Sequence, residues 1–518
     1  MSSRYLLFAV FACGMTTLAV ELTASRLLGS VFGTSNLVWA SIIGLILIYL
    51  AAGYFIGGRW ADRSPRFGTF YKIILWGAFT SGLAALAARP VLRAAADAFD
   101  QLQIAVLAGS FVSVLILFVA PITLLGTVSP FAIRLALTDK QHAGRVSGRI
   151  YAISTLGSFI GTFLPVLVFI PLVGSTSTFF IFSFFLMAVA LVGLGRAEGW
   201  RAAAGQLWAP LVLAVLAALW AGGEFKASAG QIYETESAYN YIQVVEVRGT
   251  RYLRLNEGQG IHSVYNPDQL DFHGTWEQFL AAPFFNSPPY AISDIERIAI
   301  IGLAAGTSAR QASIVFGEIP MDGFEIDPKI IEVGRQYFGM DQPSLNAIAQ
   351  DGRWGLEHSD ELYSLIEIDA YRPPYIPPHL TTVEFFEICR QHLTDDGVLA
   401  MNVGRTPEDR RLIDALVATL QEVFPSVHVM DVPNTFNSIV YATRQPTSFA
   451  NLLANYEELV GQGGVHPLLL ASIERTLDNQ RETPGGGLVL TDERAPIEWI
   501  INTMVLNFLM SDGVEELQ

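Results

Sequence analysis

Apolar runs of membrane-spanning length fill the first 222 residues and constrain the fold more than any other feature. A helix needs about 20 apolar residues to cross the hydrocarbon core of a bilayer. We predict seven such helices, at residues 5–24, 37–57, 70–88, 104–125, 150–171, 178–195 and 207–222. A cleavable signal peptide is the alternative for the first run, but one signal cannot explain six further runs. The region is therefore expected to be a multi-pass α-helical domain of the cell membrane, with the lipid bilayer as its partner.

The formal charge divides the chain at the same place. Residues 1–222 carry 14 Lys and Arg against 6 Asp and Glu, a net charge of +8, whereas residues 223–518 carry 18 against 42, a net charge of −24. An acidic second part disfavours nucleic acid as a partner and suits a cationic small molecule. The eight histidines show no zinc-ligand spacing and the two cysteines no metal set, so we predict no metal.

Beyond residue 222 the pattern changes to short apolar runs that alternate with helical periods. A β-rich lead-in is expected over 232–265. Strands are then expected at 297–303, 321–327, 346–351, 363–370 and 397–403. This alternation is typical of an α/β, Rossmann-like doubly wound parallel sheet of the kind found in S-adenosylmethionine methyltransferases. Two later runs, "SVHVMDV" and "SIVYATR", are expected to pair antiparallel at its edge.

Four consecutive strand ends carry glycines or acids. In "GLAAGTSAR", Gly302 and Gly306 let the backbone turn tightly and approach a ligand. Glu325 ends the next strand about 20 residues later, where an acid accepts both hydroxyls of a ribose. Asp351 ends the third strand, where it can accept from the exocyclic amine of adenine, and Asp369 ends the fourth. Because the carboxyl ends of parallel strands meet at one edge, we predict a ligand that contains adenosine.

The glycine-rich turn favours a nucleoside without phosphates. It lacks the tight Gly-x-Gly spacing of a pyrophosphate site and the Gly-Lys-Ser/Thr of a phosphate-binding loop. S-adenosylmethionine or a derivative fits better. We therefore divide the chain into a transmembrane domain (1–222), a β-rich lead-in with a substrate helix (223–290), a Rossmann-like nucleoside-binding domain (291–445) and a C-terminal helical extension (446–518).

Most of the second part resembles the spermidine/spermine synthase family, the polyamine aminopropyltransferases. The segments that carry the resemblance are "AYNYIQVVEV", "LNEGQGIHS", "GTWEQFLAAPFF", "IIGLAAGTSAR", "FEIDPKIIEVGRQYF" and "QDGR". Members of this family transfer an aminopropyl group from decarboxylated S-adenosylmethionine to a diamine. With its apolar first part, the whole chain resembles the bacterial membrane-fused spermidine synthase-like proteins.

The resemblance implies roles for individual residues. Asp369 matches the catalytic base, and Glu277 matches the acid that holds the attacking amine. Asn240 and His262 fall where the family has cofactor-contacting glutamines. The full set of implied cofactor-binding residues is Gly302, Gly306, Glu325, Asp351, Gly352, Asn240 and His262.

The amine side departs from the family pattern. The family's tyrosine falls at Thr275, its histidine at Trp276 and the second acid of its Asp-Ser-x-Asp motif at Arg372. The acid inside its glycine-rich turn is also missing. Each charge-assisted contact to an ammonium group is worth about 1.5–3 kcal/mol, so the loss of these acids predicts an altered acceptor.

We accordingly expect a membrane-anchored transferase that moves an aminopropyl group from decarboxylated S-adenosylmethionine to a small-molecule amine. S-adenosylmethionine itself is the other cofactor that the adenosine half would accept. One alternative is a methyltransferase on the same fold. Another is a transporter or sensor with a non-catalytic nucleoside- or polyamine-binding domain. A homodimer remains open.

Two arguments disagree about the side of the membrane on which residues 223–518 lie. Basic loops around Arg59–Arg66, Arg134–Arg149 and Arg196–Arg201 place the N-terminus in the cytoplasm by the positive-inside rule. Seven crossings then put the second part outside. S-adenosyl cofactors are made in the cytoplasm, and this favours a cytoplasmic position for the second part of the chain. Within the first run, Arg26 is expected either to reach the interface or to join a polar site between helices.

Overall fold

The computed structural model describes residues 3–32, 36–99, 105–137, 142–220, 228–256, 260–371 and 375–510. Their contacts form two compact units. The first comprises residues 1–228 with 234–241, and the second comprises residues 229–233 with 242–518. The predicted boundary between residues 222 and 223 falls in 221–227, outside the described residues.

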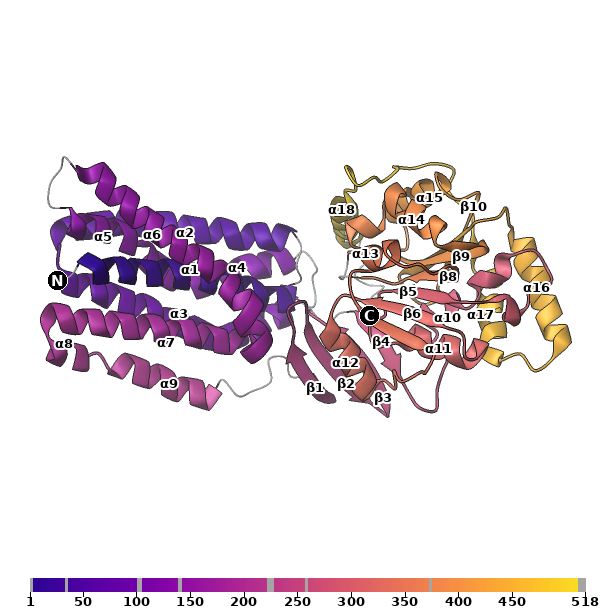
Figure 1. Ribbon diagram of the computed structural model, residues 1–518, viewed down its shortest axis with the longest axis horizontal. Coiled ribbons are helices and arrows are strands. Elements are labelled where there is room, and N and C mark those ends of the chain that lie inside the picture. Colours follow the sequence, from indigo (N-terminus) through magenta and orange to yellow (C-terminus); the bar gives the residue numbers. More distant parts are fainter. Residues whose placement is uncertain are drawn as a thin grey trace. The chain divides into compact units, whose positions relative to one another are not determined.

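The first unit is helical (Figure 1). Its helices are α1 (Ser3–Phe32), α2 (Asn36–Arg63), α3 (Phe67–Phe99), α4 (Ala105–Gly126), α5 (Val128–Ala136), α6 (Ala143–Leu164), α7 (Ile170–Glu198), α8 (Trp200–Ala204) and α9 (Trp208–Trp220). Six helical segments among the described residues are long and apolar enough to cross a membrane. One of these, Ala143–Glu198, contains two of the seven predicted runs, 150–171 and 178–195. Gly174, at φ +78°, separates its two parts.

Glycines bring α1 and α6 into backbone contact. A Cβ atom at Gly157 would lie 2.1 Å from the carbonyl oxygen of Phe11, and one at Gly161 would lie 2.0 Å from that of Met15. On the facing helix, a Cβ atom at Gly14 would lie 2.3 Å from the carbonyl oxygen of Ser154. Small residues four apart are a common means of close packing between helices in membranes. The α1–α6 contact therefore requires glycine.

Two polar contacts hold the segment 234–241 to the helices of the first unit. Arg26, near the end of α1, donates to the carbonyl oxygens of Ser237 and, at 2.8 Å, of Tyr239. Glu236 accepts from the backbone N–H of Ser175 at 2.7 Å and from its hydroxyl at 2.8 Å. Arg26 thus has protein partners at the end of its helix.

The β-rich lead-in forms a small antiparallel sheet with the order β1-β2-β3-β4. Its strands are β1 (Gln231–Glu236), β2 (Tyr241–Val247), β3 (Thr250–Leu255) and β4 (Ile261–Tyr265). The predicted hairpin corresponds to β2 and β3, with Val247 paired to Thr250 across the turn. Positive φ angles at Arg248 and Gly249 make this turn tight.

The large sheet has eight strands in the order β12-β10-β11-β9-β8-β5-β6-β7. Strands β7, β6, β5, β8 and β9 run parallel, and β11, β10 and β12 continue antiparallel. The bounds are β5 (Ile298–Ile301), β6 (Met321–Glu325), β7 (Leu345–Ala349), β8 (Tyr363–Ile368), β9 (Leu393–Gly404), β10 (Ser426–Asp431), β11 (Asn437–Thr443) and β12 (Gln480–Arg481). The predicted fold class, including the antiparallel edge, is confirmed.

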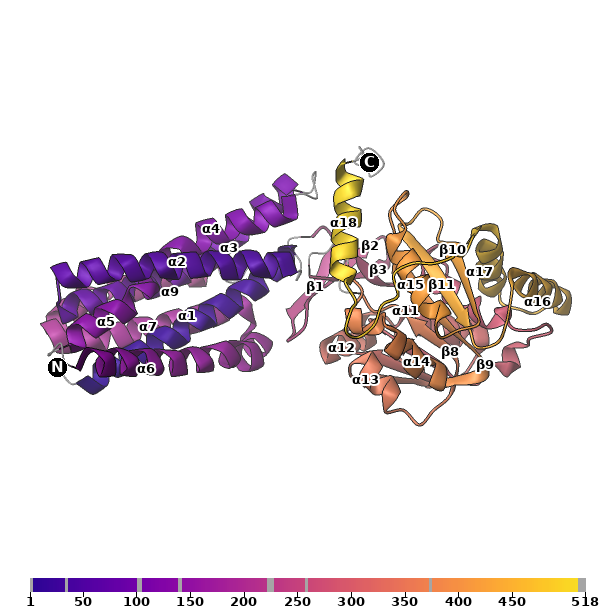
Figure 2. The same ribbon diagram turned by 90° about the horizontal axis from the view of Figure 1, so that it is seen from above.

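Helices cover both faces of this sheet (Figures 1 and 2). Side chains alternate along β5, so that Ala299 and Ile301 pack into one core cluster, whereas Ile298 and Ile300 pack into the other. The helices are α10 (Trp276–Phe279), α11 (Thr307–Phe316), α12 (Pro328–Tyr337), α13 (Gly352–Glu357), α14 (Val383–Gln391), α15 (Arg411–Gln421), α16 (Phe449–Gln462), α17 (Pro467–Asp478) and α18 (Ile497–Met510). Helix α18 contacts α15 (Figure 2).

A leucine at Gly157 is expected to destabilise the first unit. The side chain would displace the backbone of α1, and overpacking of this kind costs about 1–3 kcal/mol. The Gly157→Leu variant should therefore lose its monodisperse gel-filtration peak in detergent at a lower temperature than the original protein. Gly148→Leu on the same helix is the control, because a Cβ atom there meets nothing within 4 Å. Equal thermal stability of the two variants would contradict the close packing of α1 on α6.

Candidate functional site

The turn after β5 brings the backbone of two strands together. Gly302 has φ +87°, and a Cβ atom there would lie 2.6 Å from the carbonyl oxygen of Asp369. Gly306, at φ +84°, precedes the first residue of α11. Both glycines thus adopt a conformation that other residues rarely adopt. The turn passes directly beside the end of β8.

Glu325, the last residue of β6, is tied to this turn. Its carboxylate accepts 3.0 Å hydrogen bonds from the backbone N–H groups of Ala304 and Asp327. Burial raises the pKa of Glu325 to about 7, although these backbone donors oppose the shift. A carboxylate has roughly four lone-pair sites, so two remain for the hydroxyls of a ribose.

Asp351 begins α13 and has a partner that the sequence did not indicate. One carboxylate oxygen accepts from the backbone N–H of Trp354, and the other lies 3.0 Å from Nε2 of His379. The hydrogen bond from His379 holds the pKa of Asp351 below its ordinary value. At the adjacent Gly352, a Cβ atom would lie 2.4 Å from Cγ2 of Ile301, so this position has no room for a side chain.

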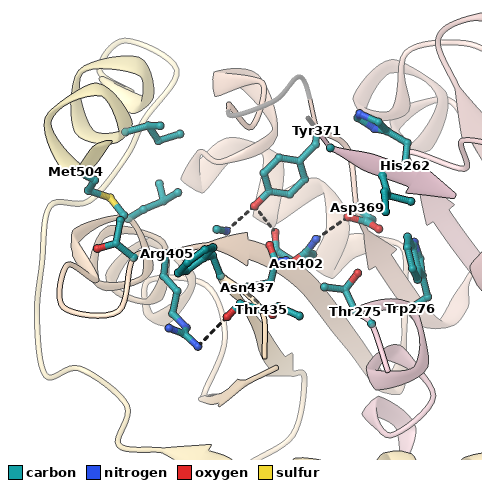
Figure 3. A pocket seen from close by; sticks show the side chains of 18 of the residues that line it. His262, Thr275, Trp276, Asp369, Tyr371, Asn402, Arg405, Thr435, Asn437 and Met504 are labelled. Carbon is teal, nitrogen blue, oxygen red and sulfur yellow. Dashed lines mark hydrogen bonds between the residues drawn. The ribbon is translucent and has the colours of Figure 1, made fainter. Parts of the chain in front are cut away.

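Asp369 follows β8 and is half-buried. Asn402, on β9, donates to its carboxylate at 2.8 Å (Figure 3). Burial raises the pKa of Asp369 to about 6, and hydrogen bonds from Asn402 and Trp276 oppose this effect. Two residues after Asp369, the hydroxyl of Tyr371 accepts a hydrogen bond from the backbone N–H of Gly404 at 2.6 Å. Asn402 is the one polar side chain in the predicted strand 397–403, one residue before its end, and this was the available signal.

A cavity of about 530 Å³ opens beside Asp369 (Figure 3). Such a volume is within the range of about 300–1,000 Å³ that is usual for small-molecule sites. The cavity is lined by residues of β4, the 274–276 loop, the ends of β8 and β9, and α18. Among them are His262, Thr275, Trp276, Ala304, Asp369, Tyr371, Asn402, Arg405, Leu412, Phe436, Ile501 and Met504.

His262 and Asn240 lie in different parts of the chain. His262, on β4, lines the cavity, and burial lowers its pKa to about 4, so its ring is neutral. Its Nε2 atom is buried without a hydrogen-bond partner among the described residues. Asn240 lies in the segment 234–241 of the first unit, and its backbone N–H donates to the hydroxyl of Ser237. Its predicted contact with the cofactor stays a prediction.

Glu277 is buried in a set of protein contacts. Its carboxylate accepts from the backbone N–H groups of Phe272 and Gly274 and from Nε2 of Gln311, all at 2.8–2.9 Å. It is absent from the described lining of the cavity, whereas its neighbours Thr275 and Trp276 line it. Glu277 therefore lies behind the cavity wall, where its carboxylate holds the backbone of residues 272–274. Arg372, at the position of the family's second acid, lies outside the described residues.

A further buried acid, Glu367, was missed in the sequence. It lies two residues before Asp369, inside the apolar run of β8, and period two places both acids on one face. One carboxylate oxygen accepts from the hydroxyl of Ser308, and the other has no partner among the described residues. Burial raises the pKa of Glu367 to about 8, and the nearby charge of Asp369 adds to the shift. An acid within an apolar strand was the available signal.

No group of three or more His, Cys, Asp or Glu side chains that could hold a metal ion occurs among the residues with described positions. The arrangement instead combines two acids suited to a nucleoside, a half-buried carboxylate and an adjoining cavity. It can bind an adenosine-type molecule at the ends of β5, β6 and β7. It can also accept a proton at Asp369.

Comparisons with known proteins agree with this chemistry. A family model described as "Spermine/spermidine synthase domain" matches residues 286–448. The chain is 32% identical over 214 residues to a polyamine aminopropyltransferase of Vibrio vulnificus, which covers 39% of this chain and 68% of that protein. It is 30% identical over 282 residues to a probable polyamine aminopropyl transferase of Bifidobacterium longum, which covers 51% of this chain and 61% of that relative's length.

Among solved structures, a probable spermidine synthase from Corynebacterium glutamicum matches 52% of this chain and 97% of its own. The TM-score is 0.40 and the sequence identity 21%.

The pH dependence of stability is expected to reveal Glu367. Because its pKa is raised from 4.5 to about 8, the folded chain holds a proton that the unfolded chain releases between those values. This acid therefore makes the free energy of unfolding fall as the pH rises from about 4.5 to 8. In Glu367→Gln the fall should be smaller, by about 1.4 kcal/mol for each unit of pKa shift removed.

The measurement is the Tm of the full chain at pH 5.5 and pH 8.5. Between these two pH values the original protein should lose about 3 kcal/mol of stability through Glu367, and Glu367→Gln should not. The drop in Tm from pH 5.5 to pH 8.5 should therefore be smaller in Glu367→Gln by about 5–10 °C. Glu458→Gln is the control, because Glu458 is exposed on α16. If both variants follow the pH dependence of the original protein, Glu367 does not carry a raised pKa.

Proposed function

The chain belongs to the spermine/spermidine synthase family of polyamine aminopropyltransferases, and on that premise we propose that it transfers an aminopropyl group from decarboxylated S-adenosylmethionine to an amine. The observation that carries the proposal is the half-buried carboxylate of Asp369. It lines the cavity and adjoins the glycine-rich turn at Gly302. One side of this carboxylate is available to a nucleoside and the other to an acceptor.

The residues of the second unit have distinct roles in this proposal. Glu325 would accept the hydroxyls of the ribose, and Asp351 would accept from the adenine amine. Asp369 would take a proton from the incoming amine. The nitrogen lone pair then attacks the carbon next to sulfur, the carbon–sulfur bond breaks, and its electron pair stays on sulfur in neutral methylthioadenosine.

Two other buried residues are proposed to act on Asp369 or its surroundings. Asn402 would orient the carboxylate and favour its ionised form through the 2.8 Å hydrogen bond. Glu277 would position Trp276 by fixing the 272–274 backbone, in place of the role of holding the amine that the family resemblance implies. His262, being neutral and lining the cavity, would contact the bound molecules without adding a charge.

We also propose that the first unit anchors the enzyme in a bilayer. Its six apolar segments support this, as does the glycine-dependent packing of α1 on α6. The segment Ala143–Glu198, at 56 residues, is far longer than the roughly 20 residues of one crossing. With its break at Gly174, it would cross twice, which gives seven crossings. The division at residues 222, 290 and 445 is kept as the proposed domain organisation.

Replacement of Asp369 by asparagine is expected to abolish proton acceptance while preserving shape. Release of methylthioadenosine from decarboxylated S-adenosylmethionine should fall by at least about 100-fold, as is typical when a general base is lost. Binding of methylthioadenosine, measured by calorimetry, should change little. The control is Asp360→Asn, since Asp360 is exposed before β8. Unchanged product formation in Asp369→Asn would remove Asp369 from the mechanism.

The pH profile is expected to report the ionisation of Asp369. Its pKa of about 6 means that the carboxyl is protonated, and unable to accept a proton, below that pH. Hence kcat should rise about tenfold per pH unit below pH 6 and then level. Asn402→Ala removes a donor to the ionised form, which raises the pKa, so this limb should move to higher pH by about one unit.

The matched control for Asn402→Ala is Asn346→Ala. Asn346 makes the same kind of bond, at 2.9 Å, to Asp322 away from the cavity. Its profile should coincide with that of the original protein. If the rise of kcat with pH occurs at the same pH in Asn402→Ala as in the original protein, Asn402 does not have the proposed effect on Asp369.

A further inference from the structure

The cavity extends along the sheet past Asp369, from the turn after β5 to β11. Ala304, in that turn, lines one end of it, and the backbone N–H of Ala304 donates to Glu325. Asn402 and Asn437, which line the other end, belong to β9 and β11, on the far side of β8 from β6 and β7. The end of the cavity at β9 and β11 therefore lies where an acceptor would approach Asp369 from the side away from Glu325 and Asp351.

The far wall of this cavity is apolar. Met504 (Figure 3) and Ile501 come from α18. Leu412 comes from α15, and Phe436 comes from the turn before β11. Leu412, Ile501 and Met504 are 1–5% exposed, so they are part of the packed core rather than of a mobile surface. Helix α18 lies beyond residues 286–448, which the family model matches. This wall favours a hydrocarbon surface on the acceptor.

The charges on the lining bear on how many ammonium groups the acceptor carries. Among the described lining residues, Asp369 is the only acid and Arg405 the only strong base. A second ammonium group at the far end would approach the guanidinium of Arg405 and find no carboxylate among the lining residues whose positions are described. His262 adds no charge to the lining, because its ring is neutral. No cysteine is present among the described lining residues.

Asp431 cannot serve as the missing carboxylate. It lies 3.3 Å from Arg405, 2.9 Å from Arg410 and 2.8 Å from Arg481, and it accepts a further hydrogen bond from Ser438. Its side chain is only 8% exposed. Three guanidinium groups thus already neutralise this acid, and they leave the adjacent region positive.

From these observations we propose that the cavity takes an acceptor with a single amine and an apolar body, that is, an alkyl or aryl monoamine. The amine nitrogen lies at Asp369, and the apolar body lies against Leu412, Ile501 and Met504. The assignment rests on the proposed aminopropyl transfer, of which it specifies the acceptor. Transfer to such an amine gives a secondary amine, with the displaced proton on Asp369 and methylthioadenosine released.

The test compares two amines of equal length on the full chain in phosphatidylcholine nanodiscs, with empty nanodiscs as the blank. Binding of hexylamine and of 1,6-diaminohexane is measured by calorimetry at saturating methylthioadenosine. We expect hexylamine to bind at least about tenfold more tightly, because both amines bury the same six carbons but the diamine must also bury a second ammonium group without a carboxylate partner among the described lining residues. Equal or tighter binding of the diamine, or no binding of either amine, would overturn the inference.

A carboxylate on the cavity wall should reverse this preference. Met504→Glu places an acid where the second ammonium group would lie, so the affinity for 1,6-diaminohexane should rise and that for hexylamine should fall. Trp499→Glu is the matched control, because it puts the same acid on the same helix at a position that is 65% exposed. A Met504→Glu protein whose preference stays with hexylamine would contradict the placement of the apolar body. The comparison on the original protein stands even if this variant fails to fold.

Turnover separates this inference from the proposed function. Methylthioadenosine release from decarboxylated S-adenosylmethionine is followed with each amine. Release with the diamine alone would keep aminopropyl transfer and reject the monoamine. Tight binding of hexylamine without release from either amine would reject aminopropyl transfer and keep the assignment of the cavity.

Discussion

The parallel pairing of β8 with β5 determines where the chemistry of this protein can take place. The backbone N–H of Asp369 donates to the carbonyl oxygen of Ile301 at 2.9 Å, which continues the ladder to the edge of the sheet. Gly302 then turns away so closely that a side chain there would strike the Asp369 backbone. Because β5 has β6 on one side and β8 on the other, the chain connections diverge at this point. Ligands of doubly wound sheets bind in the crevice that such a divergence opens.

Three acids near this crevice, two buried and one half-buried, differ in the donors they receive, and the difference bears on which one is suited to act as a base. Glu367 has the hydroxyl of Ser308 and a pKa of about 8, so it is mostly protonated at neutral pH. Glu325 has two backbone donors and a pKa of about 7. Asp369 has Asn402 and Trp276 and a pKa of about 6. Of the three, Asp369 is therefore the one that is mostly ionised when its neighbours still hold protons.

Sequence patterns predicted the parts of the site that depend on strand ends. Glu325, Asp351 and Asp369 stand at the ends of apolar runs. The alternation of predicted strands and helices is enough to place the ends of these runs at one edge of the sheet. Asn402 and Glu367 gave weaker signals, because an amide or an acid in a strand does not show what it faces. Two of the seven predicted apolar runs lie in the single 56-residue segment Ala143–Glu198, where the kink at Gly174 separates them.

The acceptor side could not be read from local patterns because distant helices build it. Helix α17 fixes the loop that bears Trp276: Ser472 donates to the carbonyl oxygen of Glu277 at 2.6 Å, and Arg475 pairs with Asp271. Helix α18 supplies the apolar wall through Ile501 and Met504. Both helices come from the C-terminal extension, whereas the nucleoside acids come from β6 and β7. Changes in the extension can therefore alter the wall of the cavity while Glu325, Asp351 and Asp369 keep their geometry, which is consistent with the proposal that the nucleoside half of the site follows the family and the acceptor half departs from it.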